Sequence, residues 1–175
     1  MNALAQLVRG RGLLLVLIGL GAATAGPVTP LLWRAVESGR FHPHAPDWAL
    51  FASQTAAIQL HVVSALVALV IGIAVLALPK GCGPHKALGW SWIAAMATTA
   101  LSSFFITGLN GDFYSFIHLL SGWVLVALPM GVYAIRRRDI RSHRRAMVSL
   151  FVGGLIVAGA FTFIPGRFMF NFIFG

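Results

Sequence analysis

The sequence predicts an all-α integral membrane protein, a helical bundle of about five transmembrane helices. Of its 175 residues, 58% are hydrophobic and only 10% are charged, whereas soluble domains are about 25% charged. The mean hydropathy is +0.86. The sequence lacks the tracts of alternating polarity that a membrane β-barrel requires. Its length suits about five helices of ~20 residues with short connections, because each helix has to cross a hydrocarbon layer of ~30 Å.

Five apolar stretches indicate the membrane helices of one membrane domain, residues 1–175. They run from Leu13 to Trp33, Ser53 to Leu78, Ala87 to Ile106, Phe113 to Ile135 and Ala146 to Ile164. The first stretch follows a basic start and has a small-residue tail, which is also typical of a secretory signal. We expect it to be an uncleaved helix. Residues 1–47 then form an extra N-terminal helix and outer loop, and residues 48–175 form a four-helix core that bears the histidines.

Basic residues predict the orientation of the chain. Ten Lys and Arg residues lie at the amino terminus and in the second-to-third and fourth-to-fifth connections, and three lie on the opposite side. Because cytoplasmic connections carry the excess of Lys and Arg, we expect a multi-pass protein of the bacterial inner membrane with a cytoplasmic N-terminus. The net charge of +9 therefore reflects topology. We expect the protein to contact the lipid bilayer and to bind no nucleic acid.

Acidic residues and thiols are scarce, which narrows the possible chemistry. None of the four carboxylates lies inside a predicted helix of the membrane, and Cys82 is the single cysteine. This disfavours pumps and transporters that use intramembrane Asp or Glu, and it disfavours hydrolysis by paired carboxylates. Histidine is the residue type that remains for a functional site.

Four of the six histidines recur at matched places on the predicted helices. His61 lies on the second helix and His118 on the fourth, toward the outer side, whereas His85 and His143 precede the third and fifth helices on the inner side. Neutral imidazoles on facing helices are suitable axial ligands for haem iron. The pattern predicts one or two haems b, each held by a histidine pair. The predicted function is electron transfer across or within the membrane, with a quinone or another redox partner.

Each histidine also has a structural alternative. His61 is compatible with a core histidine that is hydrogen-bonded across the bundle. The small residues on the same face could leave room for a macrocycle or simply allow close helix packing; they are Ser64, Ala68 and Gly72. His85 and His143 lie in basic segments that also suit contact with lipid phosphates.

Three other features are weaker candidates. Arg167, near the outer end of the fifth helix, suits either pairing with haem propionates or anchoring at the interface. His42 and His44, with Asp47, resemble a copper or zinc site, although such a short motif is more often a solvated loop. Met147, four residues after His143, suits either an axial ligand or the core.

Five segments carry a resemblance to a known family. They are IQLH (Ile58–His61), PHKALGW (Pro84–Trp90), FIHLLSGW (Phe116–Trp123), SHRRAM (Ser142–Met147) and AGAFTFIPGRFM (Ala158–Met169). The chain resembles, over about residues 55–175, a group of small bacterial predicted membrane proteins catalogued as a domain of unknown function. The resemblance implies a multi-helix membrane fold and no established activity. The first helix and its outer loop lie outside it.

The layout of His61, His85, His118 and His143 is also similar to that of the dihaem transmembrane cytochromes b that act as ascorbate-dependent ferrireductases. That resemblance implies axial ligation by all four, with helices two and four forming one pair and helices three and five the other. The spacings of 24, 33 and 25 residues are tighter than in that family. The sequence has no recognisable ascorbate-binding motif, so the electron donor does not carry over.

Two further functions compete with an electron carrier. The first is a non-catalytic accessory or scaffold subunit of a larger respiratory or photosynthetic membrane complex, because small residues suit close helix contacts. The second is a metal or small-molecule transporter that uses histidine relays. Five spans without the broken-helix symmetry of transporters fit this function less well. The sequence leaves open whether the protein is an enzyme, as a transmembrane oxidoreductase would be.

Overall fold

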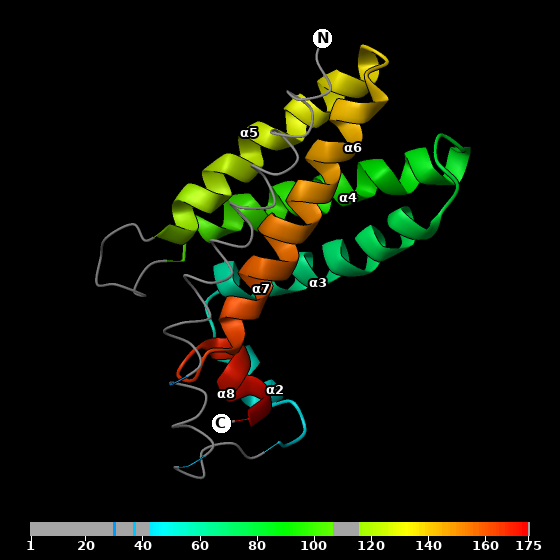
Figure 1. The fold of residues 1–175 in the computed structure, drawn as a ribbon. Helices are drawn as coiled ribbons and strands as arrows, with labels where there is room; N and C mark the ends of the chain where they lie inside the picture. Colours follow the sequence, from blue (N-terminus) through cyan, green and yellow to red (C-terminus); the bar gives the residue numbers. More distant parts are fainter. Residues whose placement is uncertain (1–29, 31–36, 38–42, 107–115, 175) are drawn as a thin grey trace. The chain divides into compact units, whose positions relative to one another are not determined.

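The computed structural model describes Pro30, Glu37 and residues 43–106 and 116–174, and all regular structure within these residues is helical. The predicted all-α fold is confirmed. The predicted first helix, apart from Pro30, lies outside the described residues. Figure 1 shows the helices, which are α2 (Trp48–Ala52), α3 (Ala56–Ala77), α4 (Gly83–Ser103), α5 (Phe116–Arg136), α6 (Ile140–Ser149), the π-helix η1 (Leu150–Val157), α7 (Ala158–Ala160), the 3₁₀-helix η2 (Phe161–Phe163) and α8 (Phe168–Phe174).

Three helical stretches of the described chain are long and apolar enough to cross a membrane: Ala56–Ala77, His118–Arg136 and Ile140–Phe163. They correspond to the predicted second, fourth and fifth spans. The predicted third span is also helical, as the 21 residues of α4. It is more polar than the others, but its Thr99, Ser102 and Ser103 are buried. Burial inside the protein keeps these hydroxyls away from lipid, as a membrane helix requires.

Local signals explain where the first two long helices begin and end. The side chain of Thr55 caps α3 by accepting a hydrogen bond from the Ile58 N–H, at 3.5 Å. Helix α3 ends ahead of Pro79, since a proline disfavours helical geometry in the residue before it. Gly81 has a φ of 80° in the connection, and Pro84 lies in the first turn of α4, where no backbone donor is needed.

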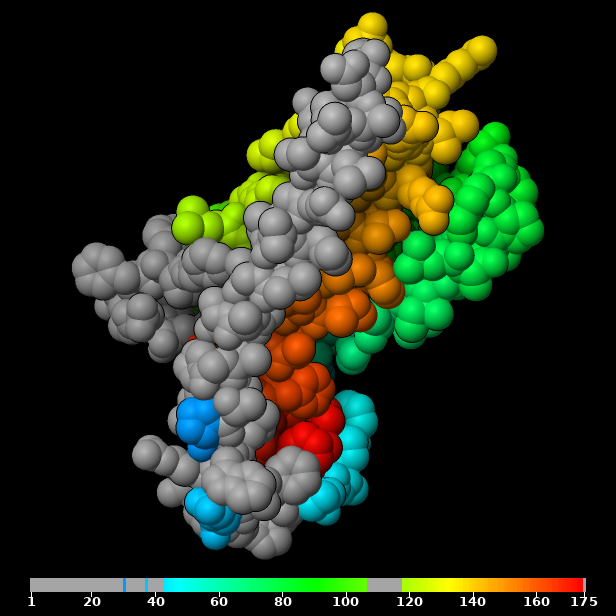
Figure 2. Space-filling view, viewed as in Figure 1, coloured from blue at the N-terminus to red at the C-terminus, as the bar shows by residue number. Residues whose placement is uncertain are grey.

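The last long helix begins earlier than the sequence predicts, at Ile140 instead of Ala146. Asp139 caps it, because its carboxylate accepts a hydrogen bond from the Ser142 N–H at 3.0 Å. Arg138 has a φ of 61° in the turn that precedes the cap. The basic residues that follow Asp139 are therefore part of helix α6. Figure 2 shows the side chains of this α5–α6 end, in yellow, extending outward. Hydropathy alone missed this start because the first turn is charged.

The described chain belongs to two compact units, Trp48–Gly159 on the one hand and Met1–Asp47 with Ala160–Gly175 on the other. In the Trp48–Gly159 unit, α3 packs against α4, α4 against α5, and α5 against α6, while η1 packs against both α3 and α5. The helices thus form a four-membered ring around a shared core. In this ring α3 lies diagonally across from α5.

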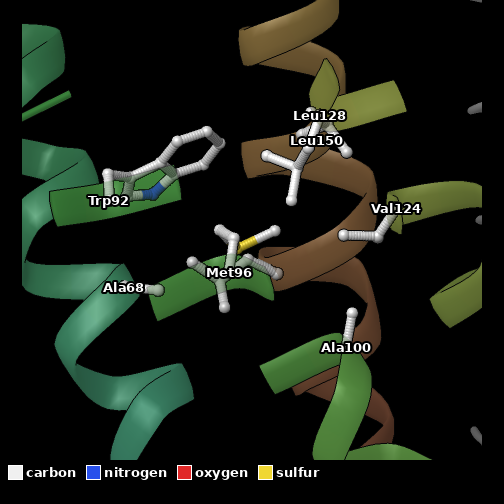
Figure 3. Close-up of a cluster of buried hydrophobic side chains, with 8 residues drawn as sticks. Ala68, Trp92, Met96, Ala100, Val124, Leu128 and Leu150 are labelled. Carbon is white, nitrogen blue, oxygen red and sulfur yellow. The ribbon is translucent and has the colours of Figure 1, made fainter. Parts of the chain in front are cut away.

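The core of this unit comes from all four sides of the ring. Figure 3 shows Met96 of α4 among core residues from the surrounding helices, with Trp92 one turn away. Met96 and Leu150 are the largest fully buried side chains among the described residues. The cluster consists of Ala68, Trp92, Met96, Ala100, Val124, Leu128, Leu150 and Leu155. Such a filled centre holds the helices together by van der Waals contact, the main attraction between helices in lipid.

Glycines allow close approach at two points of the ring. A Cβ atom on Gly72 of α3 would lie 2.5 Å from the Phe151 ring and 2.8 Å from Trp92 Nε1. A Cβ atom on Gly131 of α5 would collide with the end of the Met147 side chain. Both glycines are buried. Because neither residue has a side chain, side chains of neighbouring helices pack directly against the backbone at these two points.

The other unit contains the aromatic C-terminal helix α8. Its Phe170 and Phe172 are buried, and the rings of Phe168 and Phe172 stack with centroids 5.7 Å apart. Backbone bonds tie the loop at residues 44–47 to it: the His44 N–H donates to the Ile173 carbonyl at 3.0 Å, and the Asp47 N–H donates to the Phe172 carbonyl at 3.1 Å. The loop and α8 are thus held together within this unit.

The helix cap at Asp139 predicts that the stability of the protein depends on pH. Hydrogen bonds from Ser142, through its side chain and then its backbone, lower the pKa of the Asp139 carboxyl below its ordinary value. The stabilisation is complete above the ordinary Asp pKa of about 3.9 and is lost as the pH falls through the lowered pKa. We expect Asp139→Asn, which keeps a capping oxygen, to flatten the acid side of a thermal-unfolding profile measured by circular dichroism in detergent. An unchanged acid slope in this variant would contradict the assignment.

The close contact at Gly131 predicts that no larger side chain is tolerated where α5 meets α6. In Gly131→Val the new side chain overlaps Met147 and approaches Ala146, whose Cβ atom would be 3.2 Å from the added Cβ. We expect a loss of about 2 kcal/mol in the free energy of unfolding, the usual cost of overpacking. The matched control is Gly122→Val on the same helix, because a Cβ atom there meets nothing within 4 Å. Equal destabilisation of the two variants would show that helix propensity, and not this contact, is responsible.

Candidate functional site

His61 lies in the second turn of α3 and is half-buried. Its Nδ1 atom is 2.8 Å from the backbone carbonyl of Thr99 on α4 and 3.3 Å from the Ser102 hydroxyl. A carbonyl oxygen only accepts hydrogen bonds, so Nδ1 carries the proton and donates it. The Nε2 atom then keeps its lone pair, which is the form in which an imidazole binds a metal. The Thr99 carbonyl thereby fixes both the ring orientation and the nitrogen that can act as a ligand.

Buried hydroxyls surround this histidine. The Thr99 hydroxyl donates to the Ser64 hydroxyl of α3 at 2.9 Å, and Ser64 donates to the His61 carbonyl at 3.1 Å. The hydroxyls of Ser103 on α4 and Ser121 on α5 are 2.6 Å apart. These bonds join α3, α4 and α5 at one end of the ring. They satisfy polar groups that lipid would leave unsatisfied.

His118 lies at the start of α5, at the same end of the ring. It is 6% exposed, and its ring centroid is 5.9 Å from that of Phe104, with the planes tilted by 54°. Ser121 follows His118 by almost one helical turn and contacts Ser103, while His61 contacts Ser102. The structure therefore brings His61 and His118 to the same end, on the two helices that flank the last turn of α4.

The sequence pointed to Ser64, for its small size, and not to the hydroxyls of α4 at this end. Their signal was nevertheless present, because Thr99, Ser102 and Ser103 are spaced three and four residues apart in a membrane helix. Residues at that spacing share one helix face. A polar face on a membrane helix turns inward, toward partners on neighbouring helices. What the spacing does not indicate is that the backbone of Thr99, and not its side chain, orients His61.

His143 has the same kind of anchor as His61, but at the opposite end. Its Nδ1 atom donates to the Gly131 carbonyl of α5 at 2.9 Å, so this histidine ties the start of α6 to α5. His85 is half-buried near the start of α4, and its buried Nδ1 atom has no hydrogen-bond partner in the described part of the chain. Figure 1 shows that the α3–α4 hairpin and the α5–α6 hairpin diverge at this end. The structure does not bring His85 and His143 together.

The small-residue face below His61 is filled by protein. Ser64, Ala68 and Gly72 are the buried residues of α3. Trp92 and Phe151 occupy the space beside Gly72. On this face of α3 the small residues therefore allow close helix packing and do not leave room for a macrocycle. The Trp92 Nε1 atom is buried there and has no acceptor among the described residues, for which we have no physical account.

The remaining candidates are scattered. Arg167 is exposed, belongs to the unit that contains α8, and donates its backbone N–H to the Ile164 carbonyl at 3.0 Å. His42 lies outside the described residues, while His44 is exposed with its Nδ1 atom 2.6 Å from the Ala45 carbonyl. Met147 packs against the core. Within residues 43–106 and 116–174, no group of three or more His, Cys, Asp or Glu side chains is placed to hold a metal ion.

Comparison with known proteins identifies a family. Residues 58–174 match the family described as "Predicted membrane protein (DUF2306)". The match begins within α3 and extends into α8, so it includes His61, His85, His118 and His143. No curated protein and no solved structure matches the chain.

The hydroxyl bonds at the His61 end predict a measurable stability contribution. Thr99→Val removes the hydroxyl that donates to Ser64 but keeps the backbone carbonyl that orients His61. We expect a loss of about 0.6 kcal/mol, typical of a hydrogen bond between membrane helices, in reversible unfolding measured in mixed micelles. The neighbouring Thr98→Val serves as the control for the change in shape. A loss of the same size in Thr98→Val would argue against a role for the Thr99–Ser64 bond.

Proposed function

The chain belongs to the DUF2306 family of predicted membrane proteins, and we propose that it is an electron carrier that binds one b-type haem through His61 and His118. The hydrogen bond from His61 Nδ1 to the Thr99 carbonyl is the observation that supports this function most. A backbone carbonyl in this position is a common outer partner of metal-binding histidines, because it fixes the tautomer and makes Nε2 more basic.

The donor set suits haem better than a bare metal ion. A structural zinc ion needs four protein ligands. Haem iron takes its equatorial nitrogens from the porphyrin, so two histidines on two helices are sufficient. His61 and His118 lie on α3 and α5, the diagonal helices of the ring, near the same end. Bound there, the haem would supply reversible one-electron chemistry, while the protein would supply its axial ligands and its low-dielectric surroundings.

The position of the core supports one haem and disfavours a second. Trp92, Met96 and Leu150 fill the middle of the ring. A haem held by His61 would therefore lie at the end of the ring where α3 and α5 begin. At the opposite end the two hairpins diverge (Figure 1), so His85 and His143 do not form a second pair. His85 and His143 are accordingly not part of the proposed site.

The surroundings of the site follow from the same proposal. The electron partner is a membrane quinone or a redox subunit, since the site lies among helices that are long and apolar enough to cross a membrane. The basic α5–α6 end faces the cytoplasm of a bacterial cell, by the rule that positive connections remain inside.

The absorption spectrum of the purified protein tests this function. We expect reduced-minus-oxidised difference spectra to show a b-type haem band after expression with ample haem. His61→Ala and His118→Ala should each lower bound haem by tenfold or more, since loss of one axial ligand removes one of the two protein–iron bonds. The matched controls are His85→Ala and His44→Ala, which should retain full haem content.

Two outcomes would overturn the proposal. One is the absence of a haem band from the folded wild-type protein. The other is haem content in His61→Ala and His118→Ala equal to that of the controls. If the colourless protein instead co-purifies in fixed ratio with a respiratory or photosynthetic assembly, the accessory-subunit function replaces the electron carrier.

A further inference from the structure

A groove of about 510 Å³ lies between α4 and α5, away from the histidines. Its α4 side includes Trp90 and Ile93, and its α5 side runs from Leu125 through Val132 to Arg136. Along α5 these residues span about 16 Å at 1.5 Å per residue. The groove therefore extends along the direction of the helices. A second hollow on the same helix continues it around Pro129 and Met130.

The groove changes chemically along its length. Leu125, Ile93 and Val132 make its inner part apolar. Toward the other end come Trp90, Tyr133 and Arg136, and both aromatic side chains are well exposed. Tryptophan and tyrosine gather at the level of lipid headgroups. By this rule we expect the aromatic end of the groove, with the Arg136 cation, at the level of the headgroups and its apolar part in the hydrocarbon region.

Six arginines lie between Arg136 and Arg145, and within that stretch Asp139 is the one carboxylate, which interacts with Arg141. The Arg137 guanidinium donates to the Tyr133 hydroxyl at 2.9 Å and lies 5.5 Å from the centre of its ring, so the phenol is fixed beside the groove. Arg136 has no carboxylate partner among the described residues. Asp139, the acidic residue nearest in the chain, uses its carboxylate to cap α6. The mouth of the groove therefore remains positively charged and suits an anion.

We propose that this groove binds an anionic phospholipid, with an acyl chain along the apolar part and the headgroup phosphate at Arg136. An amphipathic ligand matches the groove because both have a long apolar part and one charged end. Basic hollows between membrane helices are suitable sites for anionic headgroups. The charge complementarity favours phosphatidylglycerol over a zwitterionic lipid.

Native mass spectrometry of the full chain released from detergent micelles tests this site. The probes are phosphatidylglycerol and phosphatidylcholine with identical acyl chains. One basic residue near a membrane surface corresponds to about fivefold in affinity. We expect Arg136→Gln to weaken phosphatidylglycerol binding about fivefold and phosphatidylcholine binding less, because the choline cation already offsets the charge of the phosphate. Val132→Phe, which fills the apolar part, should weaken binding of both lipids.

The control is Arg144→Gln, an equal change of charge on α6 that does not line the groove. It should leave the affinity for phosphatidylglycerol within about twofold of the wild-type value, less than the fivefold expected for a contacting arginine. Equal losses in Arg144→Gln and Arg136→Gln would overturn the proposal in favour of general surface attraction. Complete displacement of the lipid by inorganic phosphate would overturn it in favour of a simple anion site. A dimer that disappears in Val132→Phe would identify a second copy of this chain as the occupant.

Discussion

Close packing of α3 against its neighbours is the constraint on which the rest of the Trp48–Gly159 unit depends. Inside a bilayer, lipid tails solvate an apolar side chain as well as another helix does, so the hydrophobic effect contributes little to helix association. The helices have to gain van der Waals contact instead. Gly72 provides it, because the Phe151 ring and the Trp92 indole occupy the place where any larger side chain would project. A ring packed this tightly brings His61 within hydrogen-bond distance of the Thr99 carbonyl.

The polar interior of this unit is built from hydroxyls and imidazoles. The described membrane helices contain no carboxylate, and their buried polar side chains are Ser, Thr and His. Neutral groups of this kind are tolerated in lipid when each has a partner, whereas an isolated charge would be far more expensive to bury. A neutral imidazole is also the form that binds haem iron. The same choice of residues therefore serves both the stability of the fold and the proposed cofactor.

The two ends of the ring have different properties. At one end α3, α4 and α5 are linked by hydroxyl bonds, and the histidines of α3 and α5 lie there. At the other end the hairpins diverge (Figure 1), and exposed arginines follow one another through the α5–α6 turn. A converging end suits a buried cofactor, and a diverging basic end suits lipid headgroups. The proposed haem and the proposed lipid thus occupy separate regions of one small fold.

The sequence by itself determined the membrane class, the helical content and three of the spans, because hydropathy and helix periodicity are local properties of the chain. It also placed His61 and His118 toward the same side, since antiparallel neighbours follow from short connections. A local signal was overlooked at Asp139, whose cap starts α6 within a charged turn.

Only the tertiary structure decided which nitrogen of His61 is available as a ligand, because its partner carbonyl is 38 residues away. It also decided that the small face of α3 is filled by Trp92 and Phe151, and that His85 and His143 stay apart. These outcomes depend on the angle and distance between helices. Side-chain packing across the whole core sets that geometry, and no single segment of the chain contains it.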